Sequence, residues 1–264
     1  MRVALIADIH GNATALRSVL EDIATLDVDS VVCLGDLAAN GPEPGSVIDI
    51  IRELECPVVV GNTDEAMLDV PEWWRDPAPV GAPETAQRIV AVSAWCADQL
   101  DSGHLEFLFG LPSTLEIDLG DAGRVLCFHG SPRSSTDVIT DETPLDEVTE
   151  AMHGSSHRLL AGGHTHVPLV RPVGDQTMIN PGSVGMPFAS YGFAGEVPVM
   201  NHAAYAVVAA TAADVSVEFR EVPIDVDSLA LSVRSSSMPH GEWWLGLRSA
   251  EPPPTQPMVR IVNL

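Results

Sequence analysis

Five short segments in the N-terminal part of this chain carry side chains of the kinds that bind metal ions. Together they supply two aspartates, one asparagine and four histidines, enough nitrogen and oxygen donors to hold two metal ions. Each segment alone is weak evidence, but seven donors in this order make coincidence improbable. The segments are Asp8-Ile9-His10, Gly35-Asp36, Gly61-Asn62-Thr63-Asp64, His129-Gly130 and Gly163-His164-Thr165-His166.

The types of donor narrow the choice of metal. A mixture of imidazole and carboxylate favours Mn, Fe or Zn over metals that prefer soft sulfur ligands. Asp36 has two carboxylate oxygens, so it can bridge two neighbouring ions, and the amide oxygen of Asn62 suits a hard or borderline divalent ion. The small residues before His164 let the backbone bring its imidazole close to that of His166.

Each segment follows an apolar run that is typical of a buried strand, and this explains how distant residues could meet. The carboxyl ends of parallel strands lie at one edge of an α/β sheet, where such folds place their chemistry. We therefore expect the donors to converge at that edge. The runs are Val3–Ala7, Val31–Leu34, Val58–Val60 and Val125–Phe128, with a weaker one at Leu159–Ala161.

The chain changes character near Gly110. Before it, strands alternate with amphipathic helices, which indicates βαβ units and a parallel sheet. After it, closely spaced strands indicate a second sheet, so we expect two packed sheets with helices outside. The predicted helices are about Ala13–Leu26, Pro44–Glu55, Thr85–Leu100 and Leu145–His153; the later strands are about Thr114–Leu119, Arg124–His129, Leu169–Val173, Gln176–Ile179, Ala203–Ala210 and Ser216–Val222.

Two segments lack this regularity. Residues 65–83 contain several prolines and the pair Trp73-Trp74, and they follow a ligand-bearing loop; they are either a lid over the site or a packed surface loop. The tail from about residue 225, with three serines and three prolines in runs, is expected to wrap the body as an extended or partly mobile segment. We see no internal repeat and expect a single domain over residues 1–264.

The composition excludes some classes of partner. The chain has 13 basic residues, all arginine, against 37 acidic ones, for a net charge of −24. This argues against broad binding to nucleic acid or to anionic membranes, since both depend on basic patches. A small anionic substrate remains compatible, because bound metal ions dominate the local charge.

The cysteines and the N-terminus favour a cytoplasmic location. The four cysteines, Cys33, Cys56, Cys96 and Cys127, form no CxxC pair, so disulfides or a thiolate zinc site are not expected. A strand begins almost at once, without a signal-peptide pattern, and no apolar stretch is long enough to cross a bilayer. The sequence leaves a homo-oligomer open.

As an ordered set, the five segments resemble the motifs of the calcineurin-like metallophosphoesterase superfamily: D-x-H, G-D, G-N-(H or another residue)-(D or E), H-G and G-H-x-H. The resemblance covers about residues 1–184. It implies an α/β (α+β) fold, a four-layer αββα sandwich of two mixed sheets flanked by helices, with two divalent metal ions (Mn first, with Fe, Zn or Ni as alternatives). One ion would be bound by Asp8, His10, Asp36 and His166, and the other by Asp36, Asn62, His129 and His164.

Within the superfamily, the chain looks most like the small bacterial and archaeal phosphodiesterases. The segments Asp8-Ile9-His10-Gly11-Asn12 and Asn180-Pro181-Gly182-Ser183 carry this likeness. Thr63 stands where many relatives have a histidine thought to assist the leaving group, and threonine is neither a cation nor an acid near neutral pH. We therefore expect a phosphodiesterase acting on a small phosphate ester or nucleotide through a metal-bridging hydroxide.

Catalysis is expected to depend on Asp36, Asn62 and His129. Asn12 and Arg133 are candidate phosphate contacts, although Asn12 could equally be a turn residue. Two other functions stay open: a protein or nucleotide phosphomonoesterase, and a scaffold that kept the fold and lost activity. Thr63 counts against the first, and the intact ligand set counts against the second.

Overall fold

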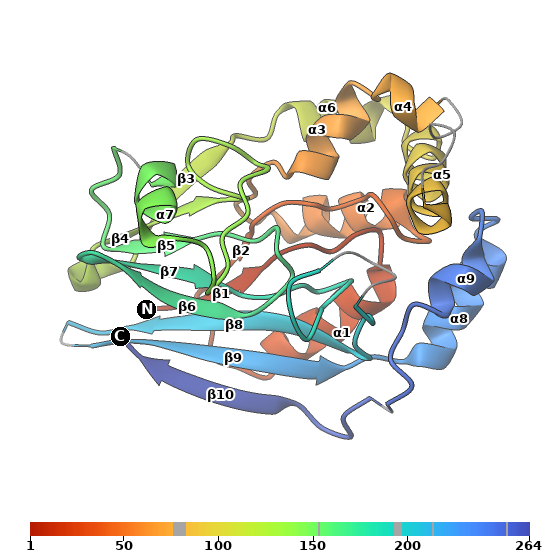
Figure 1. The fold of residues 1–264 in the computed structure, drawn as a ribbon. Coiled ribbons are helices and arrows are strands. Elements are labelled where there is room, and N and C mark those ends of the chain that lie inside the picture. Colours follow the sequence, from red (N-terminus) through yellow and green to blue (C-terminus); the bar gives the residue numbers. More distant parts are fainter. Residues whose placement is uncertain (76–82, 153, 193–196, 213, 252) are drawn as a thin grey trace.

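The computed structural model describes residues 1–75, 83–152, 154–192, 197–212, 214–251 and 253–264. Its described strands form two five-stranded mixed sheets (Figure 1). The first sheet has the spatial order β10 (Met258–Asn263), β9 (Val215–Pro223), β8 (His202–Ala210), β1 (Arg2–Ile6) and β2 (Ser30–Cys33). The second has the order β3 (Thr114–Asp118), β4 (Arg124–Phe128), β5 (Leu159–Ala161), β7 (Gln176–Asn180) and β6 (Leu169–Val173).

The two sheets pack face to face, and helices cover their outer faces. Side chains alternate along β1. Val3 and Leu5 join a core shared with Val125 and Ile179 of the second sheet, whereas Ala4 and Ile6 pack with the helices. The helices that pack on the first sheet are led by α1 (Ala13–Ala24) and α2 (Pro44–Leu54), and α7 (Leu145–Ala151) packs on the second. The expected four-layer sandwich is confirmed (Figure 1).

Between β2 and β3 the chain also forms the helices α3 (Asn62–Leu68), α4 (Glu72–Arg75), α5 (Glu84–Asp98) and α6 (Ser102–Phe109). A 3₁₀ turn, η1 (Gly120–Ala122), joins β3 to β4. The predicted irregular excursion at residues 65–83 is thus partly helical, through α3 and α4. Residues 76–82, on which the lid prediction mostly depends, lie outside the described residues, as does His153 at the predicted end of α7.

Two sequence predictions about elements need correction. Val58–Val60 is not a strand, because it forms one isolated parallel bridge, between Val58 and Cys33. The tail is not merely extended: it forms α8 (Val226–Ser235), α9 (Gly241–Leu245) and the edge strand β10. Leu229 and Trp244 of the two helices are buried in the core beside α1, since the apolar spacing along α8 supplies one packed face. No helix in the described ranges has the length and apolar character that crossing a membrane requires.

A buried ion pair joins α1 to the first sheet. Asp22 accepts hydrogen bonds from the guanidinium of Arg220 at 2.7 and 3.0 Å and from the hydroxyl of Tyr205 at 2.6 Å. Burial alone would raise the pKa of Asp22, but the hydrogen bonds from Arg220 and Tyr205 outweigh it and hold this pKa below its ordinary value. The network therefore stabilises the fold while Asp22 is ionised.

We expect Asp22→Asn to lower the free energy of unfolding at pH 7 by on the order of 3 kcal/mol, because it leaves Arg220 buried without its main partner. The folded pKa is depressed, so this stabilisation is present above the unfolded value of about 4 and fades as the pH falls through the folded value. Urea unfolding of both proteins between pH 8 and pH 3 measures the difference. A difference that grows on acidification would contradict this account.

Candidate metal centre

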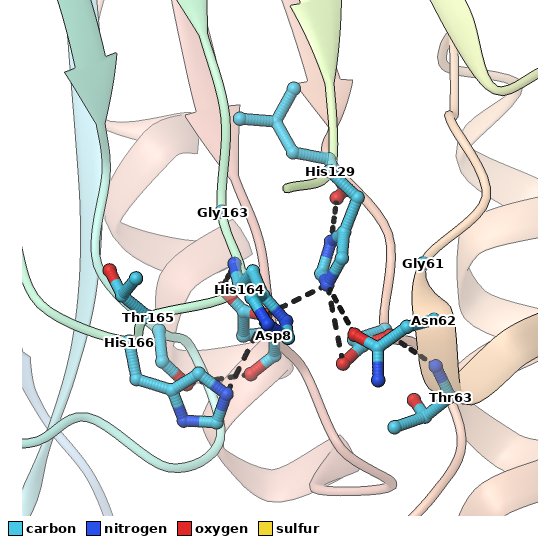
Figure 2. Close-up of polar contacts among 12 residues, drawn as sticks. Asp8, Gly61, Asn62, Thr63, His129, Gly163, His164, Thr165 and His166 are labelled. Atoms are coloured by element: carbon cyan, nitrogen blue, oxygen red, sulfur yellow. Dashed lines mark hydrogen bonds and ion pairs between the residues drawn. The ribbon is translucent and has the colours of Figure 1, made fainter. Parts of the chain in front are cut away.

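The seven predicted ligands meet at one edge of the sandwich, each just after a strand or at the start of a helix. Asp8 and His10 follow β1, Asp36 follows β2, and Asn62 begins α3. From the second sheet, His129 follows β4, and His164 and His166 follow β5. Because β1 and β2 are parallel, as are β4 and β5, these ends face the same edge. Figure 2 shows His129, His164 and His166 directed towards the Asp8 loop.

The backbone is held in an unusual conformation at most of these positions. Asp8, His10, Asp36, His164 and His166 all have positive φ, between 48° and 70°. For residues other than glycine this left-handed region costs free energy and persists only where the surrounding structure enforces it. Each turn redirects a side chain at the end of a strand, so the fold uses this strain to aim the ligands.

The carboxylate of Asp64, which is not a predicted ligand, stabilises the conformation of the loop that carries Asp36. Asp64 is fully buried, and its two oxygens accept backbone N–H groups from Asp36 at 2.9 Å, Leu37 at 2.8 Å and Gly61 at 3.0 Å. These bonds tie the turn after β2 to the start of α3. Asp64 therefore fixes the loop geometry.

The segment from Asn180 to Ser183 supports the loops of the site from behind. The Asn180 amide donates to the carbonyl of Gly163 at 2.6 Å and to the hydroxyl of Thr165 at 3.0 Å. The Ser183 hydroxyl donates to the carbonyl of Asp8 at 2.7 Å. Gly163 and Thr165 flank His164, and Asp8 is itself a predicted ligand, so the segment positions both the histidine and the aspartate loops.

The ligand atoms fall into two groups. Asp8, His10 and His166 form one, and Asp36, His129 and His164 form the other; within each group the atoms lie within 4.8 Å of one another. Asp36 lies between them, since its Oδ2 is 3.6 Å from Nε2 of His10 and 3.4 Å from Nε2 of His129. The Asn62 Oδ1 lies 3.0 Å from the same His129 nitrogen. This arrangement has the two-part form that the sequence resemblance implied.

The histidine rings present nitrogen lone pairs to one another. Nδ1 of His10 lies 3.1 Å from the carbonyl oxygen of Ala39, and Nδ1 of His166 lies 2.8 Å from that of Met186. A carbonyl only accepts, so each Nδ1 carries the proton. Burial lowers the pKa of both rings, which are therefore neutral. Their Nε2 atoms then face each other at 3.0 Å with no proton between them, an arrangement that a cation would satisfy.

The charges of His129, Asp36 and Asp8 also indicate a site that is suited to cations. Burial alone would lower the pKa of His129, but the Asp36 carboxylate outweighs it and raises this pKa to about 10. Burial likewise would raise the pKa of Asp36, yet the charge of His129 holds it well below its usual range. Burial raises the pKa of Asp8 to about 8 against the opposing charge of His129. Without cations the site thus retains protons, with which a metal ion would compete.

Thr63 lies at the edge of this group. Its backbone N–H donates to Oδ1 of Asp36 at 2.9 Å, which leaves the other Asp36 oxygen facing the histidines. Its hydroxyl is buried and has no hydrogen-bond partner among the described residues. The side chain lines the cavity in front of the site, where it offers a neutral hydroxyl and no charge.

The polar groups of the two predicted phosphate contacts are paired within the protein. Asn12 is fully buried; its Oδ1 accepts from the N–H of Ala15 at 3.0 Å and its Nδ2 donates to the carbonyl of Gly185 at 3.2 Å. It therefore caps α1, which favours the turn role over a phosphate contact. The guanidinium of Arg133 pairs with Asp137 at 2.7 Å and with Glu150 at 3.2 Å, so a phosphate would have to displace acidic partners.

Sequence reasoning missed the aromatic residues around the site. Phe188 stacks on the ring of His166, with centroids 5.1 Å apart and the planes 11° from parallel. Trp243 and Trp244 of α9 line the same cavity as the ligands. The available signal was the tandem tryptophan pair in the tail, but nothing in the sequence places that tail beside residues some two hundred positions earlier.

Comparison with known proteins places the chain in a family. A family model described as the calcineurin-like phosphoesterase superfamily domain matches residues 1–197. The chain therefore belongs to the calcineurin-like phosphoesterase superfamily. This agrees with the order of the five ligand segments and with the two packed sheets that position them.

Individual relatives extend the match beyond that region. An uncharacterized protein from Methanocaldococcus jannaschii is 26% identical over 262 residues, covering 93% of this chain and 96% of that protein. The phosphodiesterase YfcE of Escherichia coli is 26% identical over 196 residues, covering 73% and 86%. A metallophosphoesterase structure from Sphaerobacter thermophilus has a TM-score of 0.67 at 28% identity, covering 93% and 97%. A hypothetical protein from Pyrococcus horikoshii, at 24% identity and TM-score 0.75, shares the fold (95% and 99% covered).

Proposed function

We propose that this protein is a metal-dependent phosphodiesterase that binds two divalent metal ions, with manganese as the first candidate. The observation that carries the proposal is the pair of neutral imidazoles, His10 and His166, whose Nε2 lone pairs face each other at 3.0 Å. A buried arrangement of that kind, next to Asp8 and Asp36, is costly without a cation. Family membership and the likeness to a named phosphodiesterase support the same reading.

In this proposal the metal ions supply the chemistry, and the residues of the chain position them and set the charge of the site. When bound, two divalent ions would supply Lewis acidity to activate water and to neutralise the phosphoryl oxygens. The backbone turns at Asp8, Asp36 and His164 aim the ligands before any substrate arrives. The two carboxylates, Asp8 and Asp36, offset only part of the charge of two divalent ions, so the centre stays attractive to a phosphate within an acidic protein.

We also propose that the enzyme prefers diesters to monoesters, because Thr63 stands where a histidine could donate a proton. The Thr63 hydroxyl cannot donate a proton readily to a departing alkoxide, whereas a histidine at this position could. A monoester also brings a second negative charge, and among the described residues that line the cavity there is no arginine to meet it. A diester carries one charge fewer and depends less on such a group.

Metal analysis combined with a substrate panel tests the proposal. We expect the purified protein, saturated with Mn²⁺, to hydrolyse bis(p-nitrophenyl) phosphate with a kcat/KM at least about tenfold above that for p-nitrophenyl phosphate, and to bind two ions per chain. A preference for the monoester would favour a phosphomonoesterase instead. No activity on either ester, with metal bound, would favour a scaffold.

A further inference from the structure

A cavity of about 220 Å³ opens directly in front of the metal centre. One end is formed by the ligand residues, including His10, Asp36 and His164. The rest of its wall is largely apolar and aromatic, and comes from α5, from α9 and from the segment around residue 188. The side chains that matter here are Ile89, Val92, Phe188, Trp243, Trp244 and Leu247.

Hydrogen bonds fix this wall relative to the metal centre. The indole N–H of Trp244 donates to the carbonyl of Asn40 at 2.7 Å, and the hydroxyl of Ser93 on α5 donates to the Asn40 side chain at 2.6 Å. Asn40 lies four residues after Asp36, in the same loop, with φ of 68°. Both helices of the wall are therefore anchored to the loop that carries a proposed ligand, so wall and ligand keep a fixed separation.

The aromatic rings at the cavity are also held in place. Phe188 stacks on His166, and the guanidinium of Arg88 lies over the ring of Trp243, 5.5 Å from its centroid. Rings that are ordered before binding lose little conformational entropy when a ligand stacks on them. Such a wall is suited to a flat, uncharged group.

We propose that this cavity is the subsite for an aromatic ring carried on one ester oxygen of the phosphoester substrate, with Trp243 as its principal contact. The inference rests on the proposed function, because the ligand residues at the other end of the cavity would hold the phosphate. An apolar cavity of about 150 Å³ accommodates benzene, so one ring fits in this space. Apart from the ligand residues, no described side chain of the wall is charged, which disfavours a second phosphate there.

Binding of two phosphonates, which cannot be hydrolysed at the carbon–phosphorus bond, tests the subsite without relying on turnover. Phenylphosphonate and methylphosphonate share the same head group, so the ratio of their dissociation constants reports on the ring alone. We expect calorimetry on the Mn²⁺-loaded protein to give a phenylphosphonate affinity roughly tenfold or more above that of methylphosphonate, as base–aromatic stacking predicts. Equal affinities would overturn the proposal.

Variants of the cavity wall test whether Trp243 is the residue that binds the ring. Trp243→Ala should reduce the ratio to within about threefold, and Trp243→Phe, which keeps a ring, should retain most of it. Trp95→Ala is the matched control, because Trp95 lies on α5 but lines a different hollow beside α8; its ratio should equal that of the wild type. A ratio that Trp243→Ala leaves unchanged would contradict the assignment of Trp243.

The same data separate this inference from the proposed function. If the protein prefers phenylphosphonate but hydrolyses neither diesters nor monoesters, the subsite stands and the phosphodiesterase proposal fails. If it hydrolyses diesters but binds the two phosphonates equally, the subsite fails alone. If it binds neither phosphonate with Mn²⁺ present, the subsite proposal fails, and if it also hydrolyses neither ester, the phosphodiesterase proposal fails with it.

Discussion

Replacing Asp36 by asparagine should abolish hydrolysis of bis(p-nitrophenyl) phosphate, with kcat/KM reduced at least about a thousandfold, while the protein stays folded. Asp36 is the carboxylate between the two ligand groups, with Oδ2 3.6 Å from His10 and 3.4 Å from His129. An amide has nearly the same shape but no charge, and it cannot bridge two cations. A loss of about 4 kcal/mol in transition-state stabilisation corresponds to that factor.

The fold should survive this change because Asp36 contributes repulsion as well as attraction when no cation is present. It is buried close to Asp8, whose pKa it helps to raise. We expect the metal-free variant to remain folded but with a lower thermal midpoint than the metal-free wild type, because Asp36 also pairs with His129. The rise in midpoint on adding Mn²⁺ should shrink. Asp121→Asn, an exposed acid-to-amide change, is the matched control and should behave as wild type. An active Asp36→Asn enzyme would falsify the two-metal proposal.

The ligands could be predicted from the sequence because most of them follow directly after buried strands, where the chain leaves the sheet. Short apolar runs become buried strands, and polar groups directly after them, such as Asp8 and His129, must emerge at the sheet edge. The grouping into Asp8 with His166, and Asp36 with His129, follows from strand order, which the family resemblance implied and apolar periodicity alone does not specify.

Other parts of the site could not be predicted, for reasons that are equally physical. The positive φ at Asp8 and His164 has no sequence signal, because it is imposed by tertiary contacts rather than by residue preference. Val58–Val60 has the composition of a strand but pairs at one position only. The wall at Trp243 depends on where the tail packs, and a serine- and proline-rich tail gives few clues to a long-range contact.

Replacing Gly61 by alanine should be nearly as damaging as removing Asp36, although glycine has no side chain to do chemistry. A Cβ built at Gly61 would lie 2.1 Å from Oδ1 of Asp36 and 2.3 Å from its backbone nitrogen, far inside contact distance. The φ of Gly61 is −94°, so backbone strain is not the reason; the missing atom is what lets Asp36 approach. The methyl group would have to displace the proposed bridging carboxylate and the loop that Asp64 ties down.

We therefore expect Gly61→Ala to reduce kcat/KM at least about a hundredfold, since a misplacement near 1 Å at a reacting centre has this effect, and to lower stability by about 1–3 kcal/mol through overpacking. Gly110→Ala is the matched control: its φ is −78° and its nearest neighbouring atom would be 3.5 Å away, so activity and thermal midpoint should be unchanged. Activity at saturating Mn²⁺ and thermal unfolding measure both. If Gly61→Ala keeps wild-type activity, the loop can shift without moving Asp36, and close packing against Gly61 is not what positions this carboxylate.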